Sequence, residues 1–287
     1  MTEAESTFAS GGVVARRHGE HAPHAARDEV KISIRDATKV YAAKTGPVRA
    51  LEGLSVDVRE GELVCVLGPS GCGKTTLLWA LGGLHELTRG QILVDGVAVK
   101  GPRPEVMGFI FQDANLLPWR NLRQNIEFPF EIKRRPVDAV RIESLLAETG
   151  LAGFETAYPR ELSGGMQQRA SIVRALAQDP AVLLMDEPFG QLDAFTRDEM
   201  NLLLLRLWSE TGKTIVFVTH NISEAIFLSD RVVVMTPRPG RLARIFEIDL
   251  PRPRTIEMAF EPGFIALIQE IKRTVETGGR RTDVEVS

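Results

Sequence analysis

A glycine-rich stretch at residues 68–76, with the sequence GPSGCGKTT, constrains the fold of this chain more than any other feature. Residues 63–67 before it are apolar, which predicts a buried strand, and residues 75–81 after it suit the start of a helix. Glycines let backbone N–H groups turn inward around phosphate oxygens, and a helix N-terminus adds a partial positive charge. The order of strand, glycine loop and helix therefore predicts a site for a nucleoside triphosphate.

This loop is expected to surround the phosphate groups. Lys74 is predicted to contact the β- and γ-phosphates, and the hydroxyl of Thr75 to bind a magnesium ion. The residues predicted to line the site are Gly68, Pro69, Ser70, Gly71, Cys72, Gly73, Lys74, Thr75 and Thr76. The alternative is a glycine turn with an incidental lysine, and the complete motif argues against it. Kinases, GTPases, helicases and transporters all use such a loop, so it does not identify the function.

A second motif, LSGGMQQR at residues 162–169, precedes a helical pattern and then an apolar run at residues 182–185. Ser-Gly-Gly before a helix leaves free N–H donors, as an anion site does. The chain here resembles the ATP-binding cassette (ABC) ATPases over residues 30–250, with this stretch as their signature motif. In that family two cassettes pair head to tail, and each signature closes on the nucleotide of the other. The resemblance thus implies ATP as ligand, a homodimer, and nucleotide contacts from Ser163, Gly164, Gly165 and Gln167.

The resemblance also assigns catalytic roles to residues that follow predicted strands. Asp186 ends an apolar strand and corresponds to the acid that orders Mg²⁺, and Glu187 corresponds to the carboxylate that polarises the attacking water. His220, after residues 214–219, matches the switch histidine that contacts the γ-phosphate. A lone histidine at a strand end is ordinarily structural or merely exposed, but its order after Glu187 favours the functional role.

Three further residues are assigned by the same resemblance. Gln112 matches the family's glutamine loop, which reaches magnesium, contributes to catalysis and senses the membrane partner. Asp193 matches the loop that crosses the dimer interface, although Gln191 stands where the family usually has serine or alanine. Tyr41 precedes the glycine loop by the distance at which the family places an aromatic ring against adenine. A strand-end tyrosine without a ligand is the alternative for Tyr41.

The resemblance implies an α/β fold, a P-loop NTPase core of ABC-ATPase type with an antiparallel β subdomain and a helical subdomain. The cassette is expected at residues 30–250, with the helical subdomain at about 113–162. Within it, residues 137–151 show an apolar stripe at Val140, Leu145, Ala147 and Leu151. Residues 1–29 have the composition of a mobile tail. Residues 251–287 form a C-terminal extension, with a linker at 251–254 and one amphipathic helix spacing apolar residues from 264 to 275.

Composition restricts the compartment and the partners. The formal net charge of −3 offers no broad basic field, so nucleic acid is not expected as a partner. No stretch approaches the roughly 18 apolar residues that a membrane-spanning helix needs. The two cysteines, Cys65 and Cys72, suggest neither a metal site nor a disulfide, in keeping with the reducing cytosol. The expected location is the cytoplasmic face of the inner membrane, as a peripheral subunit.

The main alternative is an ABC-type ATPase of DNA maintenance or translation regulation. DNA-maintenance members insert coiled coils or zinc modules between the two motifs, and residues 75–162 contain neither a heptad run nor a cysteine quartet. Translation regulators generally carry two cassettes on one chain, whereas this chain has one. Single-cassette chains are typical of bacterial importers, which favours import with an integral membrane permease and an extracytoplasmic substrate-binding protein as partners.

Two segments resemble one importer branch, that of nitrate, sulfonate, taurine and bicarbonate uptake. They are FQDANLLPW at residues 111–119 and MTPRPGR at 235–241, the latter a predicted hairpin turn. Trp119 beside a proline suits a surface that accepts a permease helix, and internal packing of Trp119 is the alternative. The anion itself is not determined by this chain, because cargo specificity belongs to the binding protein and the permease.

Overall fold

The computed structural model describes residues 28–44 and 46–278, so most of the predicted tail at 1–29 lies outside the described residues. The strands are β1 (Val30–Ala43), β2 (Gly46–Arg59), β3 (Leu63–Leu67), β4 (Arg89–Val94), β5 (Val97–Ala98), β6 (Met107–Ile110), β7 (Val182–Asp186), β8 (Thr214–Thr219), β9 (Arg231–Met235) and β10 (Leu242–Glu247). The α-helices are α1 (Lys74–Leu81), α2 (Leu122–Lys133), α3 (Ala139–Glu148), α4 (Gly164–Leu176), α5 (Ala194–Thr211), α6 (Ile222–Leu228) and α7 (Pro262–Thr277). Short 3₁₀ turns are η1 (Pro159–Glu161) and η2 (Ile256–Phe260).

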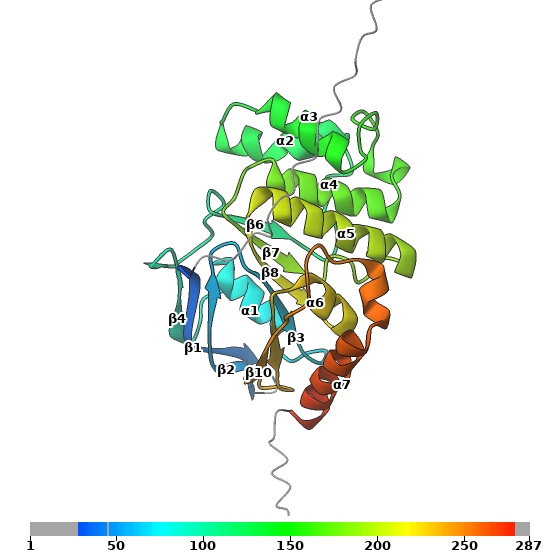
Figure 1. Cartoon of the computed structure of the whole chain (residues 1–287). Coiled ribbons are helices and arrows are strands. Elements are labelled where there is room, and N and C mark those ends of the chain that lie inside the picture. The colour runs from blue at the N-terminus through cyan, green and yellow to red at the C-terminus, as the bar shows by residue number, and fades with distance from the viewer. Residues whose placement is uncertain (1–27, 45, 279–287) are drawn as a thin grey trace, which may run out of the picture.

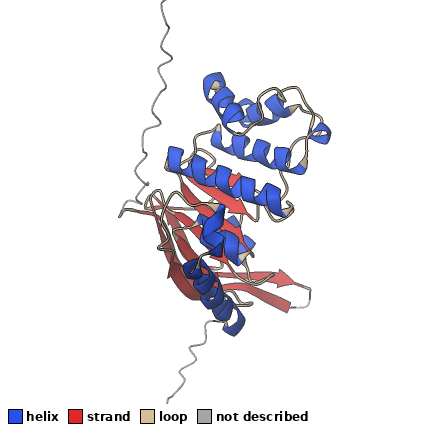
Figure 2. Ribbon diagram, turned by 45° about the vertical axis from the view of Figure 1, so that its right-hand side comes forward, coloured by secondary structure: helices blue, strands red, loops and turns tan. Residues whose placement is uncertain are grey.

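The strands form two sheets. The larger has the order β10-β9-β3-β8-β7-β6, in which β9, β3, β8, β7 and β6 run parallel and β10 is antiparallel. The smaller, β2-β1-β4-β5, is antiparallel throughout. Helices α2, α3 and α4 form a separate layer beyond the larger sheet (Figures 1 and 2). The predicted fold class, a P-loop core with an antiparallel β subdomain and a helical subdomain, is confirmed.

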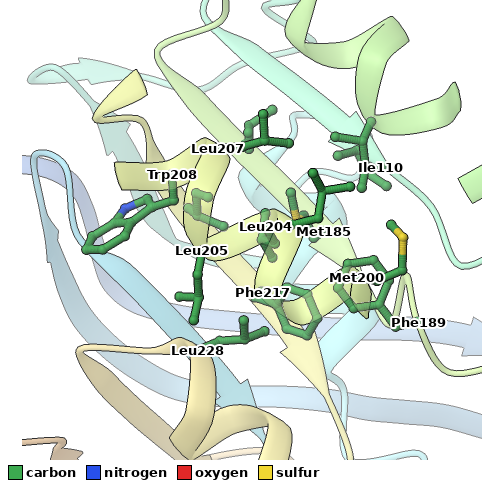
Figure 3. Packing of buried hydrophobic residues seen from close by; sticks show 14 of the residues in the cluster. Ile110, Met185, Phe189, Met200, Leu204, Leu205, Leu207, Trp208, Phe217 and Leu228 are labelled. Carbon is green, nitrogen blue, oxygen red and sulfur yellow. The ribbon is translucent and has the colours of Figure 1, made fainter. Parts of the chain in front are cut away.

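The core divides along the faces of the larger sheet because side chains alternate along each strand. In β3, Leu63, Cys65 and Leu67 pack on the helical side, whereas Val64 and Val66 face α1 and the smaller sheet. Figure 3 shows the helical side, where aromatic and aliphatic side chains of β7, β8 and α5 interdigitate. Both faces are buried, which explains why these strands are continuous apolar runs in the sequence.

The helical subdomain differs from the predicted apolar stripe. Asp138 caps α3 by accepting a hydrogen bond from the Arg141 N–H, so the helix begins at Ala139. Ile142, Leu145 and Leu146 face inward, in the i, i+3, i+4 pattern of a buried face. Leu145 and Leu151 are buried as the stripe requires, but Val140 is 82% exposed and Ala147 is also exposed. The stripe was therefore wrong at these two positions, because Val140 and Ala147 lie on the face of α3 opposite to Ile142, Leu145 and Leu146.

The predicted linker at residues 251–254 is part of the packed structure. Arg254 is buried and donates hydrogen bonds to the carbonyls of Ile226, Phe227, Ser229 and Ile248. Three of these acceptors lie in the last turn of α6 or directly after it, where helix carbonyls have no partner within the helix. Burial lowers the pKa of Arg254 to about 10, so the group remains charged at neutral pH. Helix α7 follows, with Phe264 and Ile271 buried against the core.

Replacing Arg254 by alanine should therefore destabilise the fold. The change leaves buried carbonyls of α6 unpaired, and we expect the free energy of unfolding to fall by about 2–4 kcal/mol. Urea denaturation of Arg254→Ala measures this loss. Arg273→Ala, which removes an exposed arginine of α7, is the matched control and should change stability by no more than about 0.5 kcal/mol. Equal stability of the two variants would contradict the anchoring role.

Candidate nucleotide site

The parallel strands bring segments that are far apart in the sequence to one edge of the larger sheet. Because β3, β7 and β8 run in the same direction, their carboxyl ends meet there. The glycine loop follows β3, Glu187 follows β7 and His220 follows β8. The crevice outside the carboxyl ends of such strands is where open α/β sheets bind ligands.

The glycine loop closes tightly on the neighbouring backbone. Gly71 and Gly73 have positive φ values of 73° and 106°, which a larger residue adopts only with strain. A Cβ atom on Gly73 would lie 2.7 Å from the carbonyl oxygen of Ala50, so the position has room only for glycine. Lys74 is 5% exposed, and its Nζ donates to the carbonyls of Gly68 at 3.0 Å and Pro69 at 3.3 Å. The loop thus forms a tight glycine-rich turn with a buried ammonium group beside it, the arrangement of an anion-binding loop.

Thr75 and Asp186 form an oxygen-rich pair beside the loop. The Thr75 hydroxyl donates to Asp186 Oδ1 at 3.1 Å, which joins α1 to the end of β7. Burial raises the pKa of Asp186, and the hydrogen bond from Thr75 partly offsets this. A hydroxyl and a carboxylate are ligands of the kind that Mg²⁺ prefers. Gln112 is exposed, and its Nε2 lies 3.8 Å from the position of a Cβ on Gly190, so it stands beside the loop after β7.

Glu187 lies between two groups of the site. Its Oε2 is 2.7 Å from Nδ1 of His220, and its Oε1 is 3.5 Å from Nζ of Lys74. Glu187 has a φ of 44°, an uncommon conformation for a residue with a side chain. The backbone is held there by hydrogen bonds from the Glu187 N–H to the Val218 carbonyl and from the Gly190 N–H to the Glu187 carbonyl. Lys74, Glu187 and His220 are therefore brought together.

The signature motif lies on another part of the surface. Ser163 caps α4 by accepting from the Met166 N–H, and Asp193 caps α5 by accepting from the Thr196 N–H. Gly165 packs on α5, where an added Cβ would lie 2.8 Å from Thr196 Cγ2. The side-chain amide of Gln167 donates to backbone carbonyls of Pro159 and Leu162. Among the residues that the structure describes, no hydrogen bond or ion pair joins these motifs to the glycine loop of the same chain.

Tyr41 lies near the start of α1. Its hydroxyl is 2.8 Å from Nδ1 of His85 and 3.5 Å from the hydroxyl of Thr76. The ring meets His85 edge to face, and Nζ of Lys39 lies 5.0 Å from the ring centroid. These contacts fix the ring next to the loop that is expected to bind phosphates.

Two glutamines that the sequence analysis gave no structural role hold the Gln112 segment. Gln168 is buried and its Nε2 donates to the Phe111 carbonyl at 3.2 Å, which ties α4 to the end of β6. Gln191 donates to Asp113 Oδ1 at 3.0 Å, which ties the loop after β7 to the same segment. The unusual residue at 191 thus makes a definite contact. Neither bond has a local sequence signal, because its partners lie 57 and 78 residues apart in the chain.

Comparison with known proteins gives consistent matches. The family model described as ABC transporter matches residues 51–190. An uncharacterized ABC transporter ATP-binding protein of Methanocaldococcus jannaschii is 48% identical over 231 residues, which are 79% of this chain and 86% of that protein. The aliphatic sulfonates import ATP-binding protein SsuB of Bacillus cereus is 43% identical over 224 residues, 78% of this chain and 88% of that protein.

Solved structures agree. A dimeric ATP-binding cassette in a post-hydrolysis state with ADP and Pi has a TM-score of 0.68 and 32% identity, and the match covers 77% of this chain and all of that one. The cbiO1 subunit of the cbiONQ ABC transporter complex from Clostridium perfringens has a TM-score of 0.69 and 26% identity, with 88% and 98% coverage. Identities of 43–48% over more than three quarters of the chain extend far beyond the short motifs. This chain therefore belongs to the ABC transporter ATP-binding proteins, which are ATPases.

Proposed function

We propose that two copies of this chain bind and hydrolyse ATP to energise the import of a small anion through a separate membrane permease. The observation that carries the ATPase part is the position of Glu187 between Lys74 and His220. The import part is supported by the 43% identity to a protein named for aliphatic sulfonate import. Nitrate, sulfonates, taurine and bicarbonate are the candidate cargoes, delivered by an extracytoplasmic binding protein. No helix among the described residues has the length and apolar character to cross a bilayer.

The glycine loop is proposed to hold the triphosphate. Backbone N–H groups of residues 71–76 and the Lys74 ammonium would bind the β- and γ-phosphates. The Thr75 hydroxyl and Asp186 Oδ1, which lie 3.1 Å apart, would hold Mg²⁺. Gln112 would reach the ion when the segment that carries it moves. When bound, Mg²⁺ would neutralise charge on the phosphate oxygens.

Glu187 is proposed as the residue that activates water. In this structure its two oxygens face Nδ1 of His220 and Nζ of Lys74. A γ-phosphate carries more negative charge than a carboxylate and would compete for both partners. Glu187 would then be free to accept a proton from the attacking water. The switch from Glu187 to phosphate as the partner of His220 gives the site a way to sense ATP.

The signature surface supports a head-to-tail dimer. Ser163, Gly164 and Asp193 are exposed, and nearby Phe195 is 86% exposed, so this face is accessible to a second copy. The free N–H groups at the start of α4 suit an anion from outside the chain. The nucleotide of a second copy supplies one. The similar cassette with ADP and Pi is dimeric as well.

The segment after Gln112 is proposed to contact the permease. Asn125 is fully buried, and its side chain accepts from the Leu117 N–H and donates to the carbonyls of Leu117 and Arg120. This loop is therefore preorganised, yet Trp119 at its tip is 70% exposed. The ring is therefore not packed inside the fold and is accessible to a partner. A hollow of about 200 Å³, lined in part by Phe109, Phe111 and Pro129, lies between the sheet and the helical subdomain.

Glu187→Gln should abolish turnover without abolishing ATP binding. Loss of a positioned base is expected to lower the hydrolysis rate about 10²- to 10⁴-fold, while the phosphate contacts remain. Phosphate release and equilibrium ATP binding measure the two effects. The Glu187→Gln protein should dimerise with ATP but not with ADP. Light scattering can detect the change in mass. Turnover within about threefold of wild type would disprove the role as base.

Tyr41→Ala should weaken ATP binding if the ring stacks on adenine. The expected loss is about 1–3 kcal/mol, the usual contribution of one base stacked on an aromatic ring. Tyr41→Phe is the matched control, because it keeps the ring and removes only the hydroxyl that faces His85. Titration with a fluorescent ATP analogue should place Tyr41→Phe near wild type. Equal loss in both variants would assign the effect to the hydroxyl and contradict stacking.

Trp119→Ala should uncouple hydrolysis from transport. The exposed ring makes no contribution to the nucleotide site, so we expect ATPase activity of the isolated subunit within about twofold of wild type. Uptake of labelled taurine, alkanesulfonate, nitrate and bicarbonate should fall in cells that carry Trp119→Ala in place of the wild-type chain. Phe260→Ala, another exposed aromatic at 78%, is the control and should support uptake. Lys74→Ala should support none, and uptake of all four anions with Lys74→Ala would refute the proposed function.

A further inference from the structure

The turn at residues 236–240 lies at the same sheet edge as the glycine loop. Strand β9, which ends at Met235, pairs in parallel with β3, which ends at Leu67. Both chains therefore leave the sheet side by side, one into the glycine loop and the other into the turn. The sequence pattern predicts only a hairpin connection between β9 and β10 for this turn.

The backbone of the turn packs directly on the glycine loop. A Cβ atom on Gly240 would lie 2.2 Å from the Cys72 carbonyl oxygen, so Gly240 and Cys72 are in backbone contact. Gly240 also donates to the Ala50 carbonyl at 2.9 Å, and the Glu52 N–H donates to the Gly240 carbonyl at 3.0 Å. Gly73 packs against the same carbonyl of Ala50. The turn, strand β2 and the glycine loop thus form one packed unit.

Thr236 gives the turn a fixed shape. Its hydroxyl donates to the Pro239 carbonyl at 3.0 Å and accepts from the Arg241 N–H at 3.0 Å. Its own N–H donates to the Arg241 carbonyl at 2.9 Å. With both ends of the turn joined through one residue and with two prolines between them, the position of residue 238 is well defined.

Arg238 extends from this turn onto the loop. Its Nε donates to the Gly71 carbonyl at 3.3 Å, and one terminal guanidinium nitrogen lies 3.3 Å from the position of a Cβ on Gly71. The side chain is exposed, and no carboxylate of residues 28–44 and 46–278 forms an ion pair with it. The nearby Arg241 and Arg244, in contrast, pair with Glu52 and Glu270. Arg238 is thus an unneutralised cation next to the predicted phosphate site.

We propose that Arg238 is a positioning residue for nucleotide binding, which acts through the carbonyl of Gly71. The hydrogen bond holds the peptide between Gly71 and Cys72 in the orientation that keeps the glycine loop open for phosphate. A guanidinium at that carbonyl also leaves positive charge next to the entering triphosphate. The MTPRPGR segment therefore belongs to the nucleotide site, although it has no part in recognising the transported anion. This inference rests on the proposed role of residues 68–76.

The test compares nucleotide affinity and turnover of Arg238→Ala with those of wild type. We expect the Kd for both ATP and ADP to rise about 3- to 10-fold, the range for one charge-assisted hydrogen bond that is partly exposed. KM for ATP should rise with it, whereas kcat should remain within about twofold because Glu187 and His220 are not touched. Arg238→Lys keeps the charge and a donor and should restore most of the affinity.

Two controls make the outcome decisive. Arg244→Ala removes an exposed arginine of β10 that pairs with Glu270, and its Kd should equal that of wild type. Lys74→Ala tests the site itself and should lose most ATP binding. Wild-type affinity in Arg238→Ala, together with weak binding in Lys74→Ala, would overturn the inference and leave the proposed function intact. Wild-type affinity in Lys74→Ala would instead refute the site. A Kd for Arg244→Ala as high as that for Arg238→Ala would also overturn the inference.

Discussion

The parallel ladder of β9, β3, β8, β7 and β6 is the constraint on which the rest of this structure depends. Parallel strands place all of their carboxyl ends at one edge, and a buried parallel sheet needs cover on both faces. The two hydrophobic clusters supply that cover, one under the helices and the other between the sheets. Because both faces of the sheet are buried, the polar groups of the site lie at the ends of the strands. The packing of the core determines the position of each group.

The polar groups at that edge are held in place by one another. Lys74 is buried and donates to two loop carbonyls, and Asp186 already accepts from Thr75. Glu187 faces both Lys74 and His220, so the groups proposed to meet the γ-phosphate now satisfy one another. A ligand that replaces Glu187 as the partner of Lys74 and His220 would change the contacts of the loops after β3, β7 and β8 together. Such an exchange is a physical basis for linking nucleotide state to closure of a dimer.

The fold and the motifs were predictable because their signals are local. A glycine loop between an apolar strand and a helix, or an acid pair that ends an apolar strand, lies within about ten residues of sequence. The buried face of α3 was not predicted, because it depends on which side of the helix packs on α4 and the core, where Ile142 is buried while Val140 is exposed. The segment at 251–254 has the proline and charge of a linker, yet Arg254 is buried as a helix cap.

By itself, the sequence determined the ABC-type fold and the class of ligand, and it predicted the residues of the phosphate site. Only the tertiary structure decided which distant groups meet: Gln191 with Asp113, Gln168 with the Phe111 carbonyl, and Arg238 with the Gly71 carbonyl. The reason is physical. A motif is a run of neighbouring residues whose backbone geometry the chain specifies locally, whereas these contacts join segments 57 to 167 residues apart. Such segments become neighbours only because the strand order of the sheet places their ends side by side.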